Sequence, residues 1–218
     1  MLTRMPSTPD NKPPPANNTK PPALTSLLKN GKLPLALCAI ALLIQLGGHE
    51  ASLWLRYDRE GILNGEVWRI ITGHLVHLGW PHLLMNLTGL ILIWLLFGHL
   101  IKRNSWLIIC TTSTIGISAG MMFFNPELKW YVGLSGVLHG MFVAGAIVSI
   151  KAGYRAEWLL LLLLSGKLAW EQMVGPLPGS AEFAGGNVIV DAHLYGAISG
   201  LLISLALITY YSSRRQTA

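Results

Sequence analysis

Six apolar segments constrain the fold of this chain more than any other feature of its sequence. Each approaches or exceeds the roughly 20 apolar residues that a membrane-spanning helix needs. The segments are residues 33–54, 80–101, 105–124, 134–150, 157–175 and 190–211. The 218 residues are 52% hydrophobic and 12% charged, a balance too apolar for an ordinary soluble domain. The sequence therefore predicts an all-α membrane protein, a bundle of six transmembrane helices.

The positive charges predict how this bundle is oriented. Basic residues precede the first segment and follow the second, fourth and sixth: Lys29, Lys32, Lys102, Arg103, Lys151, Arg155, Arg214 and Arg215. Acidic residues dominate the opposite ends. This is the positive-inside pattern, and it predicts that both termini are cytoplasmic. We therefore attribute the net charge of +6 to membrane topology, and expect a lipid bilayer as partner, with no nucleic acid and no cofactor.

The regions outside the six segments define the expected domain limits. Residues 1–30 are rich in Pro, Asn, Thr and Lys and predict a disordered cytoplasmic tail. They lack the short apolar core and cleavage site of a signal peptide, so the first segment is expected to stay in the membrane. The six-helix domain is predicted at residues 31–213, with a short cytoplasmic tail at 214–218. Cys38 and Cys110 lie within apolar segments and are predicted to be buried thiols.

A serine flanked by glycines opens the fourth segment, in the run Gly133-Leu134-Ser135-Gly136. Glycines remove side-chain bulk, so another helix or a substrate backbone can approach closely. A serine at a helix N-terminus also lies beside unpaired backbone N–H groups, which can hold a developing oxyanion. Such clusters are common in simple helix packing too, so this motif alone leaves both interpretations open.

A histidine opens the sixth segment, and a stripe of small residues follows it on the same helical face. A matching stripe runs along the fourth segment below Ser135. The stripes comprise Gly196 and Gly200 after His193, and Gly136, Gly140 and Ala144 after Ser135. If the two stripes pack together, His193 reaches Ser135. An imidazole beside a serine hydroxyl can act as the general base that activates a nucleophile.

The start of the second segment carries polar residues at a similar depth. His82 and Asn86 are at i and i+4, on one face and within the outer ~10 Å of the helix. With the backbone N–H of Ser135 they can form an oxyanion hole. His77 and His82 belong to a group of three histidines in nine residues, which also suggests zinc. No His-Glu-x-x-His motif or nearby carboxylate accompanies them, so we expect no metal.

Two further pairs of residues have both a structural and a functional interpretation. Trp68 and Arg69, in the loop after the first segment, are predicted to anchor that loop at the interface, with the guanidinium near lipid phosphates. Lys167 and Glu171 lie at i and i+4 in the fifth segment, where charge is costly. A structural ion pair is one interpretation, and a gate or a contact with substrate is the other.

Taken together, these residues resemble the rhomboid intramembrane serine proteases. The shared pattern is Trp-Arg in the first loop, His-x-x-x-x-His-x-x-x-Asn from His77 to Asn86, Gly-x-Ser-Gly at Ser135, and Ala-His with following glycines at His193. The resemblance implies a Ser–His dyad without a catalytic acid, so Asp191 is not required. It also implies a serine recessed in a water-filled cavity, with the fifth helix and the loops gating the access of substrate.

One position departs from the family pattern. Four residues after the nucleophile, rhomboids usually carry a tyrosine that stacks on the catalytic histidine, and here that position is His139. Whether His139 stacks on, hydrogen-bonds to or titrates with His193 stays open. The run Gly-Leu-Ser-Gly-Val-Leu-His-Gly and the compact core resemble the rhombosortase branch. That resemblance implies substrates anchored by a C-terminal transmembrane helix with a preceding Gly-Gly and a basic end, cleaved at the periplasmic face of a bacterial inner membrane.

Two other classes of protein compete with a protease. A catalytically inactive rhomboid-like binding protein would be expected to lose the serine or the histidine, and this chain keeps both Ser135 and His193. A transporter or channel would be expected to show internal repeats or helices broken at mid-membrane. The polar residues here cluster instead at one face. The sequence therefore favours a protease, and it indicates no particular oligomeric state.

Overall fold

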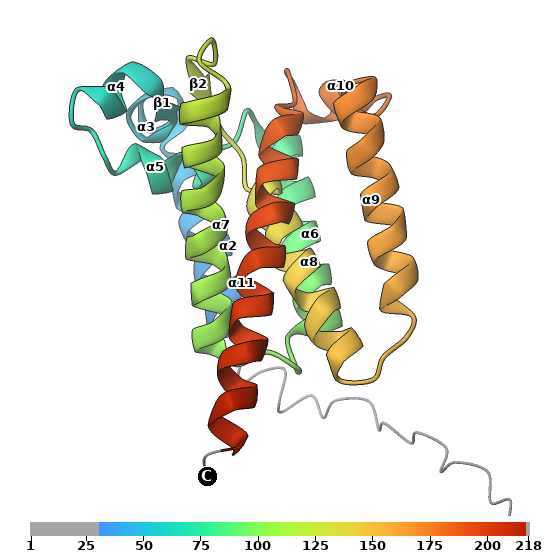
Figure 1. The fold of residues 1–218 in the computed structure, drawn as a ribbon. Helices are drawn as coiled ribbons and strands as arrows, with labels where there is room; N and C mark the ends of the chain where they lie inside the picture. The colour runs from blue at the N-terminus through green and yellow to red at the C-terminus, as the bar shows by residue number, and fades with distance from the viewer. Residues whose placement is uncertain (1–30, 217–218) are drawn as a thin grey trace, which may run out of the picture.

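The computed structural model describes residues 31–216, which form a bundle of helices (Figure 1). The elements in chain order are α2 (Lys32–Leu46), α3 (Gly48–Leu55), β1 (Tyr57–Asp58), α4 (Arg59–Leu63), α5 (Arg69–Thr72), η1 (Gly73–Leu75), α6 (Trp80–Phe97), α7 (Arg103–Phe124), β2 (Trp130–Tyr131), α8 (Ser135–Lys151), α9 (Glu157–Met173), α10 (Ser180–Ala184) and α11 (Val190–Gln216). The tail predicted at residues 1–30 and residues 217–218 lie outside the described part. Helix α11 extends to Gln216, beyond the limit expected at residue 213.

Within residues 31–216, three helices are long and apolar enough to cross a membrane: α6, α7 and α11. The first predicted segment is not one straight helix, because α2 and α3 are bent by 118° at Gly47 and Gly48. Gly48 has a φ of 65°, in the left-handed region that favours glycine and ends helices. Counted as one span, this pair brings the candidate spans to four. Helix α8 is apolar but only 17 residues long.

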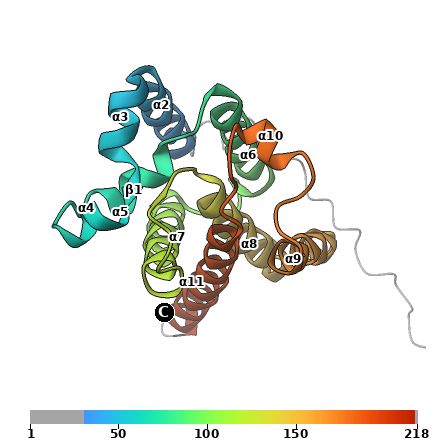
Figure 2. The same cartoon turned by 90° about the horizontal axis from the view of Figure 1, so that it is seen from above.

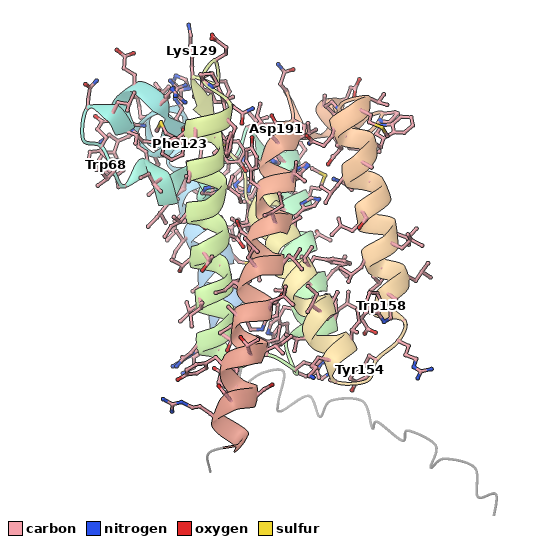
Figure 3. The ribbon with its side chains drawn as sticks, viewed as in Figure 1. Trp68, Phe123, Lys129, Tyr154, Trp158 and Asp191 are labelled. Carbon is pink, nitrogen blue, oxygen red and sulfur yellow. The ribbon has the colours of Figure 1, made fainter. Side chains whose placement is uncertain are left out.

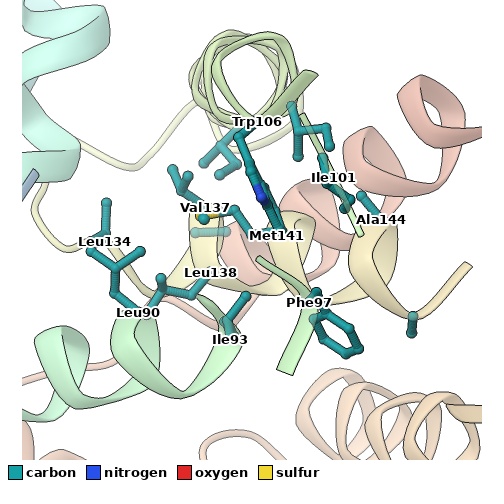
Figure 4. Packing of buried hydrophobic residues seen from close by; sticks show 14 of the residues in the cluster. Leu90, Ile93, Phe97, Ile101, Trp106, Leu134, Val137, Leu138, Met141 and Ala144 are labelled. Carbon is teal, nitrogen blue, oxygen red and sulfur yellow. The ribbon is translucent and has the colours of Figure 1, made fainter. Parts of the chain in front are cut away.

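Helix α8 is the centre of the bundle and contacts α6, α7, α9 and α11. Ten of its 17 described residues are buried. Figure 4 shows Val137 and Met141 of α8 packed among buried residues such as Leu90 and Ile93 of α6. Helix α9 lies at the edge of the bundle, as the view from above shows (Figure 2). Helix α8, which begins at Ser135, is thus packed against neighbouring helices on most sides, whereas α9 has neighbours on few sides.

Aromatic residues lie near both ends of the bundle, as expected for a protein that meets two membrane interfaces. Figure 3 shows Trp68 and Phe123 toward one end and Tyr154 and Trp158 toward the other. Phe123 is 77% exposed and Trp158 is 62% exposed, so both side chains face the surroundings of the protein. The α6–α7 and α8–α9 connections share their end with the C-terminal part of α11 (Figure 1).

A two-stranded sheet, which the sequence did not predict, ties two distant loops together. Strands β1 and β2 pair antiparallel, with Tyr57 opposite Tyr131 and Asp58 opposite Trp130. Two residues are too few to show a strand period, so no sequence pattern indicated this pairing. The sheet connects the loop after α3 to the segment that leads into Ser135.

The two cysteines are free, and each is only half-buried. The prediction of buried thiols was therefore correct only in part. A helix in a membrane bundle is enclosed by protein on the side that faces its neighbours, while its other side contacts lipid.

Candidate active site

The first turns of α8 and α11 bring Ser135 and His193 together. The Oγ atom of Ser135 lies 2.9 Å from Nε2 of His193. Ser135 is half-buried, and His193 is only 5% exposed. Helix α8 begins below the upper ends of α7 and α11 (Figure 1), so the serine lies below the rim of the bundle.

A seam of glycines between α8 and α11 makes this approach possible. A Cβ atom on Gly196 would collide with the backbone oxygen of Gly136, and one on Gly200 would collide with that of Gly140. No side chain fits between the two backbones, which is the geometry that small-residue stripes allow. The predicted packing of the two stripes is thus confirmed, and it is this packing that places His193 at the serine.

The ring of His82 lies beside Gly133, in the segment that leads into Ser135. Its Nδ1 atom accepts a long hydrogen bond of 3.4 Å from the backbone N–H of Leu78, which assigns the proton of a neutral ring to Nε2. A Cβ atom on Gly133 would lie 3.1 Å from that Nε2 and 4.0 Å from the Ser135 Oγ. The Nε2–H group of His82 and the Ser135 hydroxyl therefore border the same small space.

Asn86 and His77 lie close to His82. Asn86 is buried, and its Nδ2 atom donates a 3.1 Å hydrogen bond to the backbone oxygen of His82. An amide nitrogen carries two hydrogens, so this bond uses one of them. The buried ring of His77 packs edge-on against that of His82, with 5.0 Å between the ring centroids. His77 thus supports the orientation of the His82 ring.

The segment before Ser135 is held by two hydrogen bonds that the sequence did not indicate. The hydroxyl of Tyr131 donates to the backbone oxygen of Gly133 at 2.7 Å, and the Gly133 N–H donates to the Gly73 oxygen at 3.2 Å. Gly133 has a φ of 128°, which other residues rarely adopt. Gly133 is therefore needed for the backbone conformation of this loop, and its missing side chain also leaves room for the His82 ring.

The predicted position of Arg69 near lipid phosphates is wrong. Arg69 is 8% exposed, and its Nη1 atom donates to the backbone oxygens of Leu53 and Arg56 at 2.8 and 3.0 Å. Its Nε atom pairs with Glu66. Buried carbonyl groups need donors, and the guanidinium supplies several at once. Trp68 is 38% exposed, and its exposed position is compatible with an interfacial role.

The ion pair expected between Lys167 and Glu171 is present, with 2.7 Å between Nζ and Oε1. The same carboxylate also reaches the histidine beside Ser135, since its Oε2 lies 3.0 Å from Nδ1 of His193. The sequence alone did not assign this contact. The sequence feature that could have indicated it is a carboxylate in the outer part of an apolar segment, at the depth of His193. Asp191 instead accepts a 2.6 Å hydrogen bond from Asn125.

His139 takes two of the three roles that the sequence left open. Its ring stacks on that of His193, with 4.2 Å between centroids and 16° between planes. Its Nδ1 atom lies 2.8 Å from the backbone oxygen of Ser135. The histidine therefore stacks, as a tyrosine at this position would, and also forms a hydrogen bond within the first turn of α8.

Three of these groups have the arrangement of a possible metal site. His139, Glu171 and His193 each offer a ligand atom, and these atoms lie within 4.8 Å of one another. The ammonium group of Lys167, however, is 3.0 Å from His139 Nε2 and 2.7 Å from Glu171. A positive charge already lies among the donors, so the donor set favours an ion-pair cluster over a metal centre.

The fold and the site define a polytopic membrane protein with a serine–histidine pair near one end of its central helices. Residues 64–210 match the family model described as the rhomboid domain, and the chain belongs to the rhomboid family. It is thus a multi-pass membrane protein and an intramembrane serine protease of the rhomboid type.

Two relatives illustrate this similarity. The putative rhomboid protease YdcA of Bacillus subtilis (strain 168) is 28% identical over an alignment of 180 residues that covers 78% of this chain and 84% of that protein. The rhomboid protease GlpG of Salmonella choleraesuis (strain SC-B67) is 25% identical over 173 residues, which are 79% of this chain and 59% of that protein. The chain therefore spans about three fifths of the length of GlpG.

Proposed function

We propose that Ser135 and His193 hydrolyse peptide bonds of membrane-anchored proteins, with Ser135 as nucleophile and His193 as general base. The observation that carries this proposal is the 2.9 Å contact between the Ser135 hydroxyl and the imidazole Nε2. A hydroxyl is a weak nucleophile unless a base accepts its proton, and this contact is the geometry that such activation needs. Ser135 is half-buried rather than fully enclosed, as a residue that meets a substrate must be.

In the proposed reaction, the Ser135 oxygen attacks the carbonyl carbon of the substrate while its proton passes to His193. The tetrahedral intermediate collapses when the carbon–nitrogen bond breaks and His193 returns the proton to the leaving amine. Water then attacks the acyl ester with the same base and releases the acid. The His82 Nε2–H group and the Ser135 backbone N–H are the expected oxyanion donors, and Asn86 is a further candidate.

We test the nucleophile with a fluorophosphonate probe, which forms a covalent bond with an activated serine. The purified protein is expected to be labelled in detergent, and Ser135→Ala is expected to abolish the labelling. Labelling is read by in-gel fluorescence and located by peptide mass spectrometry. Ser165 of α9 lines an apolar cleft between α8, α9 and α11 and serves as the matched control, so Ser165→Ala should leave the signal unchanged. Labelling that persists in Ser135→Ala would refute the assignment.

The proposed location is a bacterial inner membrane, with the active site facing the periplasm and both termini in the cytoplasm. The basic residues that follow α6 and α8, and those in the last turn of α11, support this orientation through the positive-inside rule. In this arrangement α2 with α3, α6, α7, α8, α9 and α11 provide six crossings. Helices α8 and α9 have 17 residues each and are about 25 Å long, so the short α8 keeps Ser135 below the membrane surface.

The proposed substrate class is a protein anchored by a C-terminal transmembrane helix that is preceded by Gly-Gly. A transmembrane helix offers no free backbone to a protease, because its N–H and C=O groups are paired internally. Two glycines reduce helix stability by about 2 kcal/mol relative to alanines and have no side chains to obstruct a recessed serine. A basic end would keep the substrate helix oriented with its C-terminus inside.

Replacing both substrate glycines with valine is expected to prevent cleavage of a co-expressed substrate. Valine restores a helix-compatible backbone and adds two branched side chains at the site of attack. The products are mapped by mass spectrometry, with Ser135→Ala as the control for other proteases. Cleavage that is undiminished, or that maps deep inside the substrate helix, would remove the rhombosortase assignment and leave a rhomboid protease of other specificity.

A further inference from the structure

We propose that Glu171 is the residue that positions the general base, as part of a closed circuit of hydrogen bonds with Lys167 and His139. This inference rests on the proposed function, in which His193 activates Ser135. It adds to that function a buried carboxylate that a Ser–His dyad does not contain. The circuit begins at the Ser135 carbonyl and ends at the Ser135 hydroxyl.

The contact between Glu171 and His193 selects the tautomer of the histidine. The Nδ1 atom of His193 lies 3.1 and 3.0 Å from Oε1 and Oε2 of Glu171, and the two residues are 5% and 3% exposed. A carboxylate only accepts hydrogen bonds, so the proton of the neutral ring lies on Nδ1. The lone pair is then on Nε2, directed at the Ser135 hydroxyl 2.9 Å away. This is the tautomer that a general base needs.

The tautomer of His139 follows from the same reasoning. Its Nδ1 atom is 2.8 Å from the Ser135 carbonyl oxygen, which only accepts, so Nδ1 carries the proton. The Nε2 lone pair then accepts a hydrogen from Lys167 Nζ, which is 3.0 Å away. A tyrosine here could stack on His193 but has no ring nitrogen to accept from Lys167. The histidine at this position and the lysine on α9 therefore fit each other.

Lys167 joins the two halves of the circuit. Its ammonium donates to His139 on one side and to Glu171 Oε1, 2.7 Å away, on the other. It is also 3.5 Å from Nδ1 of His193, but both of these groups are donors, so they repel rather than bond. The Glu171 carboxylate offsets this repulsion when His193 gains its second proton during catalysis. Without Glu171, the lysine would oppose the imidazolium that the reaction forms.

The circuit also couples the catalytic geometry to the position of α9. Lys167 and Glu171 both belong to α9, and Glu171 is the one buried side chain among the described residues of that helix. Helix α9 contacts α8 and α11 and otherwise stands at the edge of the bundle (Figure 2). A displacement of α9 would remove the carboxylate from His193. The general base is therefore oriented only while α9 is packed against α8 and α11.

The experiment compares kcat and KM of the purified full-length protein and its variants on one cleavable substrate. Glu171→Gln is expected to lower kcat on the order of 10²- to 10⁴-fold, the upper figure being that of a triad aspartate replaced by asparagine. The KM should change little, because Glu171 acts through His193. Glu171→Asp should recover part of the loss. Glu157→Gln, at the far end of the same helix, is the matched control and should retain full kcat.

A spectroscopic signal separates positioning from a general structural role. In the Ser135→Ala background, the Nδ1–H proton of His193 should give a far-downfield resonance in nitrogen-15 histidine-labelled protein. Glu171→Gln should remove this resonance, while Glu171→Asp and Glu157→Gln should keep it. A normal kcat in Glu171→Gln, or a lost kcat with the resonance unchanged, would overturn the positioning role. Failure of the proposed function is distinguished by wild-type protein that shows no Ser135-dependent cleavage.

Discussion

Ser135→Ala and His193→Ala are each expected to abolish proteolysis. In serine proteases the loss of the nucleophile or its base lowers kcat by about 10⁶-fold, and the two losses are not additive. The double variant should therefore be no worse than either single variant. Asp191→Asn should retain most of the activity, because Asp191 bonds to Asn125 rather than to His193. The measurement is cleavage of a membrane-anchored substrate by purified protein.

Substitutions of the residues around Ser135 are expected to reduce kcat to different extents. His82→Ala should reduce kcat on the order of 10²-fold, the usual effect of removing one oxyanion donor. His99→Ala provides the control, because His99 follows α6 at the opposite end of the bundle, where its ring packs against Tyr154. Activity lost in Asp191→Asn with the fold intact would make Asp191 part of the machinery. An equal loss in His82→Ala and His99→Ala would contradict the oxyanion assignment.

Gly196→Ala is expected to destabilise the protein strongly and to inactivate it. Its Cβ atom would collide with the backbone oxygen of Gly136, and a backbone oxygen cannot rotate away as a flexible side chain can. Overpacking of this kind costs about 1–3 kcal/mol, and the helices must separate to relieve it. A 1 Å displacement of His193 from Ser135 can by itself reduce the rate about 10²-fold.

Gly166→Ala is the matched control for the glycine seam. Gly166 lies inside α9, and a Cβ atom there would meet nothing within 4 Å. Alanine has a higher helix propensity than glycine by about 1 kcal/mol, so this variant should be as stable as the wild type or slightly more stable. The midpoint of thermal unfolding in detergent measures both effects. Equal midpoints for Gly196→Ala and wild type would show that α8 and α11 can separate without loss of stability, which would contradict the prediction.

The helices and the central pair of the site were predictable because their signals are local. The apolar segment beginning at residue 80 predicted the start of α6, and the glycine-flanked Ser135 predicted the start of α8. The stripes of small residues predicted which two helices pack closely, because only glycine permits backbones to touch. The packing then brings His193 to Ser135, as the sequence analysis expected.

The tertiary structure decided the features that depend on contacts between distant segments. Arg69 is buried because it donates hydrogen bonds to the backbone oxygens of Leu53 in α3 and of Arg56 just after it. Nothing next to Arg69 in the sequence indicates these partners. The bend at Gly47 and Gly48 interrupts an apolar run whose composition alone is that of one continuous span. The charges of Lys167 and Glu171 were visible in the sequence as an i, i+4 pair. Their assignment to His193 needed the packing of α9 against α11, because a periodicity shows which residues share a face but not which helix that face meets.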